Sequence, residues 1–152
     1  GTVGMLAVPD GSINVVPGRC EFSLDIRATT DEVRDACLSD VRNGLAELCA
    51  RRGVQATLEE TMRAAAAPCD AALRRHWEQA VEAQGLPVHR LPSGAGHDAM
   101  KLHTRMPQAM LFVRGENAGI SHNPLESVTQ HDADLCVRAF ITLLDQLATE
   151  SP

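Results

Sequence analysis

Two histidines in this sequence lie on short stretches that also contain glycine. His97 follows residues 93–96 (Ser-Gly-Ala-Gly), and His122 comes shortly after Gly119. Glycine lets the main chain approach a ligand closely, and an imidazole can donate a proton, accept one or bind a metal. Both stretches are therefore candidates for active-site loops, with the apolar segment 109–113 lying between them in the sequence.

His122 is the strongest single candidate for a metal ligand. A neutral imidazole on a glycine-bounded loop after a strand suits zinc, and Glu126 is close enough in sequence to orient that imidazole. A loop histidine that hydrogen-bonds only to the backbone explains the same residues equally well, because one histidine without partner ligands is weak evidence. Taken from these residues alone, both interpretations stay open.

The loop before His97 also has two explanations. Asp98 could cap a short helix that follows, which accounts for Asp98 without any ligand. Capping does not account for Gly94 and Gly96, which indicate either close approach of a ligand or a tight turn. The other histidines lack such a setting and are interpreted as surface or helix-face residues: His76, His89, His103 and His131.

Asn14 and Arg27 are the polar residues that could hold a substrate in the first part of the chain. Arg27 ends an alternating segment on its polar side, and a guanidinium binds a carboxylate through two parallel hydrogen bonds. The amide of Asn14 can both donate to and accept from another amide. A solvated strand end is the commoner explanation of such residues when they are considered alone.

The first 63 residues are expected to form strands and one helix. Strands are predicted over 2–8, 19–27 and 54–62, of which 19–27 alternates apolar and polar side chains. A helix is predicted from a Thr-x-x-Glu capping box at Thr29 to a terminating Gly53. This pattern is typical of a two-layer α+β sandwich with an antiparallel sheet.

Residues 64–152 show a different pattern after an alanine-rich linker. The expected elements are helices over about 70–85, 99–103 and 132–148, and strands over 88–91 and 110–113. The apolar stripes expected to be buried on the two longer helices are Leu73, Trp77, Ala80 and Val81, and Leu135, Cys136, Ala139, Phe140, Leu143, Leu144 and Leu147. Alternating helices and strands predict parallel α/β layering, so the two halves are expected to be separate domains, 1–63 and 64–152.

The composition narrows the possible functions. The formal net charge is −6 and Lys101 is the only lysine, which argues against nucleic-acid binding because that requires a basic face. No apolar run is long enough for a membrane span, and no signal peptide opens the sequence. Five cysteines, an odd number without a Cys-x-x-Cys pair, favour reduced and buried thiols in a cytoplasmic protein.

Three stretches together resemble the M20-type metal-dependent amidohydrolases. Within them, the resemblance is to the branch of N-carbamoyl-L-amino-acid hydrolases, allantoate amidohydrolases and β-ureidopropionases. The stretches are residues 13–18 running on to 24–27, residues 93–99, and residues 119–124 with Glu126. Three motifs in the family's order are far more specific than any one of them. The resemblance covers the C-terminal portion of a family member, so this chain, which opens without methionine, is expected to be a fragment or a processed product.

The resemblance implies a partial α+β two-layer lid, or dimerisation, domain over 1–63. It implies the C-terminal part of an α/β metallo-amidohydrolase catalytic domain over 64–152. A homodimer formed through the lid domain and a small carboxylate-bearing substrate are implied as partners.

The resemblance also implies roles for individual residues. His122 matches the last ligand of a site with two divalent metal ions. Zinc is the expected metal, and manganese, cobalt and nickel are alternatives. Asn14 and Arg27 match lid residues that hold the substrate's amide and carboxylate, often across the dimer from the metals. The substrate pocket would be lined by Gly94, Ala95, Gly96 and His97, and Glu126 would support His122.

The remaining metal ligands and the glutamate that acts as general base would lie upstream of Gly1. No catalytic residue is therefore expected in this chain, which is expected to bind metal weakly and to be inactive by itself. An M20 peptidase or aminoacylase is an alternative activity, and a non-catalytic dimerisation module is an alternative of another class. The arrangement of Asn14 and Arg27 and the Gly-Ala-Gly-His-Asp motif favour the carbamoyl hydrolases.

Overall fold

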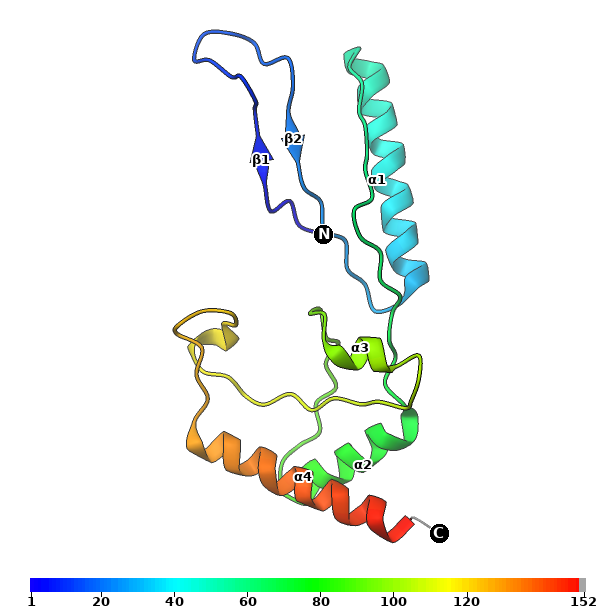
Figure 1. The fold of residues 1–152 in the computed structure, drawn as a ribbon, viewed down its shortest axis with the longest axis vertical. Helices are drawn as coiled ribbons and strands as arrows, with labels where there is room; N and C mark the ends of the chain where they lie inside the picture. The colour runs from blue at the N-terminus through cyan, green and yellow to red at the C-terminus, as the bar shows by residue number, and fades with distance from the viewer. Residues whose placement is uncertain (151–152) are drawn as a thin grey trace. The chain divides into compact units, whose positions relative to one another are not determined.

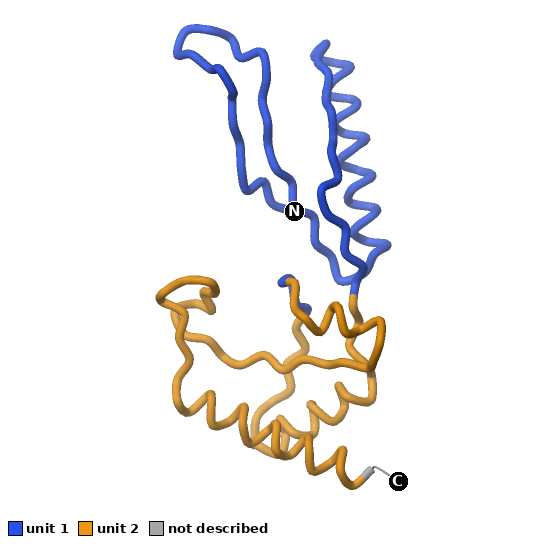
Figure 2. Tube along the Cα trace, viewed as in Figure 1, with its two compact units in different colours: residues 1–66, 92–95 blue, residues 67–91, 96–152 orange. Residues whose placement is uncertain are grey.

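The computed structural model describes residues 1–150, which contain helices and one small sheet (Figure 1). The elements are β1 (Leu6–Ala7), β2 (Glu21–Phe22), α1 (Asp31–Arg52), α2 (Ala71–Glu82), α3 (Asp98–Leu102), the short 3-10 turn η1 (Asn117–Gly119) and α4 (Gln130–Glu150). The chain divides into two compact units (Figure 2). Unit 1 contains residues 1–66 and 92–95, and unit 2 contains residues 67–91 and the described residues from 96 onward.

Unit 1 opens with a long hairpin. The strands β1 and β2 pair antiparallel with Leu6 opposite Phe22, and isolated bridges join Thr2 to Asp25 and Ser12 to Val15. The predicted strands over 2–8 and 19–27 are therefore correctly placed, but their ladder is much shorter than the alternation indicates. One interruption has a local cause, because the hydroxyl of Ser23 accepts the Met5 N–H at 3.0 Å in place of a carbonyl.

The hairpin does not bury the face that its alternation predicts. Phe22 is 51% exposed and Leu24 is 37% exposed. Alternation identifies which side chains share a face, but burial also requires an element that covers that face. Within the described part of unit 1, no such element covers these two side chains.

The long helix α1 confirms the prediction for residues 29–53, with a change at its first turn. Thr30, rather than Thr29, caps the helix, and its hydroxyl accepts the Val33 N–H at 3.4 Å. The helix ends at Gly53, whose φ of 66° is favourable for glycine and whose N–H donates to the Cys49 carbonyl.

The predicted strand over 54–62 is wrong. The segment runs extended beside α1 (Figure 1), but it has no ladder partner among the described residues. Side-chain contacts hold it instead, because Arg63 hydrogen-bonds to Asp35 at 2.7 Å and to Glu60 at 2.6 and 3.0 Å. A period of two predicts an extended backbone, whereas a strand also needs a neighbouring strand to bond with.

The core of unit 2 lies between α2 and α4. Its buried side chains are Trp77, Ala80, Ala139 and Leu143, with Ala109, Leu111 and Leu147 packed against them. These four buried residues confirm the inner part of both predicted stripes. Phe140 and Leu144 were also expected to be buried, but they are 48% and 50% exposed, because they flank the contact between the two helices.

The predicted strands over 88–91 and 110–113 are also wrong. Both segments are extended without ladder bonds, so the part of unit 2 that the structure describes lacks the expected α/β layering. Arg90 ties the first segment to α2 by bonding Glu78 at 2.7 and 3.0 Å. The buried amide of Gln108 ties the second to the chain before α2 by donating to the Ala67 carbonyl at 3.3 Å. Hydrogen bonds between such side chains and distant residues cannot be predicted from the spacing of apolar residues.

The cysteines were predicted to be reduced and buried, and the structure agrees only with the first of these two properties. All five are free thiols. Cys20 and Cys37 are exposed and the other three are half-buried, so the expectation of buried thiols is wrong.

Among residues 1–150, no helix combines the length and the apolar character that a membrane crossing requires.

The start of α2 provides a direct test of helix capping. The Asp70 carboxylate accepts the N–H groups of Ala72 and Leu73, both at 2.9 Å. We expect Asp70→Ala to lower the free energy of unfolding by about 1 kcal/mol, because two N–H groups lose their acceptor. Urea unfolding followed by circular dichroism measures the change. Asp70→Asn, which keeps the acceptor oxygen, is the matched control, and equal losses in both variants would contradict the capping role.

Candidate functional site

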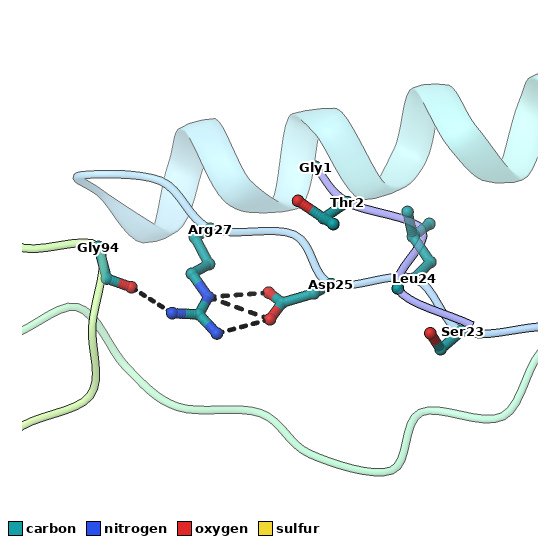
Figure 3. Close-up of a pocket in the computed structure, with 8 residues that line it drawn as sticks. Gly1, Thr2, Ser23, Leu24, Asp25, Arg27 and Gly94 are labelled. Atoms are coloured by element: carbon teal, nitrogen blue, oxygen red, sulfur yellow. Dashed lines mark hydrogen bonds and ion pairs between the residues drawn. The ribbon is translucent and has the colours of Figure 1, made fainter. Parts of the chain in front are cut away.

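Arg27 and Asp25 form an ion pair at the base of the unit 1 hairpin (Figure 3). Arg27 Nε lies 3.1 and 3.0 Å from the two carboxylate oxygens of Asp25, and Nη2 lies 2.7 Å from Oδ2. The remaining terminal nitrogen, Nη1, donates to the Gly94 carbonyl at 2.5 Å. This group borders an open depression of about 700 Å³, whose other lining residues are Gly1, Thr2, Gly4, Ser23 and Leu24.

The pair changes the acidity of both of its members. The hydrogen bond from Arg27 lowers the pKa of the Asp25 carboxyl, and the attraction of the positive charge adds to that effect. The hydrogen bond to Asp25 in turn raises the pKa of Arg27 above its usual value. Both groups therefore carry their charges at neutral pH, and the depression contains an oriented guanidinium.

The lowered pKa of Asp25 predicts how the pair responds to acid. The ion pair is complete above pH 3.8, the usual value for aspartate, and is lost only as the pH falls through the lower pKa of the folded protein. A ¹³C NMR titration of the Asp25 carboxyl should therefore have its midpoint below pH 3.8. In Arg27→Gln the midpoint should move back up, and an unchanged midpoint would mean that Arg27 does not cause the shift.

Asn14 does not lie with Arg27 in this unit. It belongs to the turn closed by the Ser12–Val15 bridge, where its Oδ1 accepts the Ser12 hydroxyl at 3.0 Å. Arg27 lies beyond the Thr2–Asp25 bridge, at the opposite end of the hairpin. Asn14 and Arg27 therefore lie apart within this hairpin, and their roles in holding a substrate stay predictions.

In unit 2, His122 lies on a loop that closes on itself. The Glu116 N–H donates to the Ser127 carbonyl at 2.9 Å, and the Ser127 hydroxyl donates to the Glu116 carboxylate at 2.9 Å. The amide of Asn117 donates across the loop to the Leu125 carbonyl at 2.7 Å. These bonds hold the two ends of the loop together, so His122 is presented from a defined backbone.

The contact between His122 and Glu126 differs from the prediction. The backbone N–H of His122, not its imidazole, donates to Glu126 Oε2 at 2.9 Å. The bond supports an uncommon backbone, because His122 has a φ of 55° in the left-handed region. Glu126 therefore stabilises the loop conformation that carries the imidazole, and a direct role in orienting the ring stays a prediction.

Sequence reasoning missed the closing residues of this loop: Glu116, Asn117 and Ser127. Asn117 also has a left-handed φ, of 51°, which asparagine adopts more readily than most residues. Its position in Gly-Glu-Asn-Ala-Gly was the one available signal for a turn. The bonds across the loop could not be read from the sequence, because they join residues about ten positions apart.

His97, rather than Asp98, caps helix α3. Its Nδ1 accepts the Ala99 N–H at 3.0 Å, and Asp98 is the first helical residue. Since Nδ1 is the acceptor in this bond, the neutral ring carries its proton on Nε2, which is left as a donor. The helix has only five residues, so this cap does more to orient the imidazole than to stabilise a long element.

The backbone at the two glycines before His97 does not itself require glycine. Neither Gly94 nor Gly96 has a left-handed φ. A side chain at Gly94 would meet no atom of the chain within 4 Å, and one at Gly96 would make ordinary contact with Met100 at 4.0 Å. Within the described residues, neither position therefore requires glycine for its backbone or for space, and a role in the approach of a ligand stays a prediction.

A metal centre requires several donor side chains close together. Among residues 1–150, no three His, Cys, Asp or Glu side chains gather closely enough to hold a metal ion. His122 itself is exposed. The described residues therefore do not form a complete metal centre by themselves.

The predicted site residues are divided between the two units. Unit 1 contains Asn14, Arg27, Gly94 and Ala95, and unit 2 contains Gly96, His97, His122 and Glu126. The loop over 93–99 crosses from one unit to the other between Ala95 and Gly96. Each unit therefore holds its own group: an oriented guanidinium in unit 1, and two loop-borne imidazoles in unit 2.

Comparison with known proteins shows similarity over almost the whole chain. The family model of peptidase family M20/M25/M40 matches residues 2–146. The N-carbamoyl-L-amino acid amidohydrolase of Geobacillus stearothermophilus is 36% identical over 148 residues, which are 97% of this chain and 36% of that protein. The allantoate amidohydrolase of Bacillus subtilis is 35% identical over 148 residues, with 97% and 35% of the two chains covered.

A solved structure shares the fold. The crystal structure of a hydantoinase/carbamoylase family amidase from Burkholderia ambifaria superimposes with a TM-score of 0.81 at 30% sequence identity. The match covers 93% of this chain and 33% of that one. The chain thus spans about a third of the length of the relatives that it matches.

Proposed function

Because the chain belongs to peptidase family M20/M25/M40, we propose that it forms part of a metal-dependent amidohydrolase that acts on non-peptide C–N bonds. The proposed substrate is an N-carbamoyl amino acid or a ureido acid, and the bond cleaved is its carbamoyl or amide C–N bond. The observation that carries this proposal is the similarity, over 97% of the chain, to an N-carbamoyl-L-amino acid amidohydrolase and an allantoate amidohydrolase. The whole enzyme would be longer, since the chain covers about a third of those proteins.

We assign the substrate's carboxylate to Arg27. Its guanidinium borders an open depression and is oriented by Asp25, and a guanidinium matches a carboxylate in shape and charge. We also assign Gly94, Ala95, Gly96 and His97 to the substrate pocket of the whole enzyme, supported by the family membership and by the free space at Gly94. Asn14 would hold the amide of a substrate in a site other than that of its own Arg27, such as that of a second subunit.

We assign one metal ligand to His122. Zinc is the first choice, manganese, cobalt and nickel are alternatives, and two ions are proposed for the complete site. The support is the family membership together with the self-closing loop that presents the imidazole. Because the described residues hold one candidate ligand, the other ligands and the general base would come from the rest of the enzyme, and we assign no catalytic residue to this chain.

The proposed organisation follows the two units. Unit 1 would belong to a lid domain that mediates homodimerisation, and unit 2 would be the C-terminal part of the catalytic domain. The five free thiols support a reducing compartment, for which we propose the cytoplasm.

The family description also supports a second activity, because it names a peptidase family. A peptidase or aminoacylase would use the same carboxylate recognition on a different acyl group. The two activities therefore differ in the acyl group of the substrate, which is a carbamoyl group for the first activity.

A substrate comparison tests the proposal. The full-length enzyme, loaded with zinc or manganese, is assayed with N-carbamoyl-L-amino acids, allantoate, N-acetyl amino acids and dipeptides. We expect turnover of the first two and little of the others, and none by the 152-residue chain alone. Preferred hydrolysis of dipeptides or N-acetyl amino acids would replace the proposal with the second activity. Turnover by the chain alone would contradict the assignment of the catalytic residues.

A further inference from the structure

We propose that Asp25 is a positioning residue that holds the Arg27 guanidinium so that one N–H on each terminal nitrogen is available to a ligand carboxylate. This inference rests on the proposed function, which assigns the carboxylate to Arg27. It adds a residue to which neither the sequence analysis nor the comparisons assign a role. The hydrogen bonds that hold Arg27 in this position are drawn in Figure 3.

The backbone of Asp25 is anchored before its side chain is considered. Its N–H donates to the Thr2 carbonyl at 2.9 Å, and its carbonyl accepts the Thr2 N–H at 2.8 Å. This reciprocal pair fixes Asp25 in an isolated antiparallel bridge. Residues 25 and 27 lie two positions apart, so their side chains leave an extended backbone on the same side. The bridge thus places the carboxylate where it can reach the guanidinium.

The donors of Arg27 can be counted. A guanidinium has five N–H groups: one on Nε, two on Nη1 and two on Nη2. Asp25 takes the Nε–H and one N–H of Nη2, and the Gly94 carbonyl takes one N–H of Nη1. One N–H on Nη1 and one on Nη2 therefore have no partner among the described residues. Two donors on neighbouring terminal nitrogens are the pair that binds a carboxylate through two hydrogen bonds.

The restraint has a physical benefit because Arg27 is solvent-exposed. Its side chain is 61% exposed, and that of Asp25 is 50% exposed. An unrestrained arginine would have to lose rotamer freedom when it binds a ligand, and this loss weakens binding. Asp25 removes much of that freedom beforehand. Because Asp25 also cancels the charge of Arg27 locally, recognition would depend on hydrogen-bond geometry more than on net charge.

The test uses the 152-residue chain with N-carbamoylglycine as the carboxylate probe. NMR spectra of the arginine Nε–H groups, with the Arg27 signal assigned from its absence in Arg27→Lys, report the guanidinium directly. In Asp25→Asn we expect the Arg27 signal to move upfield, because Nε–H loses its ionised acceptor. We also expect the Kd for N-carbamoylglycine to rise about tenfold, the size of a weakened hydrogen bond to a charged group.

Three comparisons separate positioning from a general structural role. Asp25→Glu keeps an ionised acceptor and should bind more tightly than Asp25→Asn. Asp10→Asn removes one negative charge from an exposed turn of the same hairpin and should bind like the unmodified chain. N-Carbamoylglycinamide lacks the carboxylate, so its weaker binding should be the same with and without Asp25.

Several results would overturn the inference. They are an unchanged Arg27 signal in Asp25→Asn, an unchanged Kd, an equal loss for the amide probe, or absence of N-carbamoylglycine binding at the Arg27 signal of the unmodified chain. If the NMR spectrum shows that Asp25→Asn is unfolded, Asp25→Glu becomes the deciding variant. Its Arg27 signal and its Kd must then stay near those of the unmodified chain. Failure of the proposed function is observed separately, as absence of turnover by the full-length enzyme.

Discussion

Replacement of His122 by asparagine in the full-length enzyme is expected to lower kcat/KM for an N-carbamoyl amino acid by more than about 100-fold. The expectation follows from the proposed ligand role, because loss of residues that merely support a metal ligand already costs about 10–100-fold. Asparagine is the informative substitution here. His122 has a φ of 55°, and asparagine accepts the left-handed region more readily than alanine does. The backbone bond to Glu126 can therefore persist while the imidazole is lost.

Metal content and a matched variant make this result specific. Bound metal per protomer, measured by atomic emission after dialysis, should fall together with the activity. His89→Asn changes an exposed histidine for which the structure gives no role in the site, and it should leave both quantities unchanged. Retention of full metal content and activity in His122→Asn would remove His122 from the metal centre. The His122 loop would then be a structural feature.

Replacement of Trp77 by alanine is expected to have the largest effect on stability, a loss of about 3–5 kcal/mol in the free energy of unfolding of unit 2. Trp77 is 9% exposed and packs with Ala80, Ala139 and Leu143 in a small core. Its ring centroid lies 5.5 Å from that of Phe140 at an interplanar angle of 54°, an arrangement that adds to the buried area. No other side chain of this core is comparable in size, so the cavity would be poorly filled.

Urea unfolding measured by circular dichroism is the appropriate measurement, because Trp77 is the only tryptophan and its fluorescence disappears with the substitution. Val137→Ala is the matched control, since Val137 lies on α4 but is 58% exposed, and its effect should stay within about 0.5 kcal/mol. A loss below about 1 kcal/mol in Trp77→Ala would mean that the contact between α2 and α4 does not stabilise unit 2.

The loops and the ion pair orient the candidate groups within each unit. The His122 loop is closed by its own hydrogen bonds, His97 is held by the cap of α3, and Arg27 is held by Asp25. Each of these groups is oriented by neighbours within its own unit. Groups that are oriented in advance lose less freedom on binding, which favours both affinity and catalysis.

The sequence by itself determined the helices and the family. Capping residues, helical spacing and a terminating glycine predicted α1, α2 and α4, because these signals are local and each acts within one or two turns. The motifs over 13–27, 93–99 and 119–126 predicted the family, which the match over residues 2–146 confirms. Trp77, Ala80, Ala139 and Leu143 were identified as core residues from their period alone.

Only the tertiary structure decided which extended segments pair and which polar groups meet. Residues 54–62, 88–91 and 110–113 have the pattern of strands, but a strand exists only where a neighbour supplies ladder bonds, and alternation carries no information about that neighbour. The same limit applies to the site. The bond of Arg27 to the Gly94 carbonyl joins residues 67 positions apart, and no period or motif encodes such a contact. The residue types therefore indicated the chemistry, and the folded backbone decided which of them could act together.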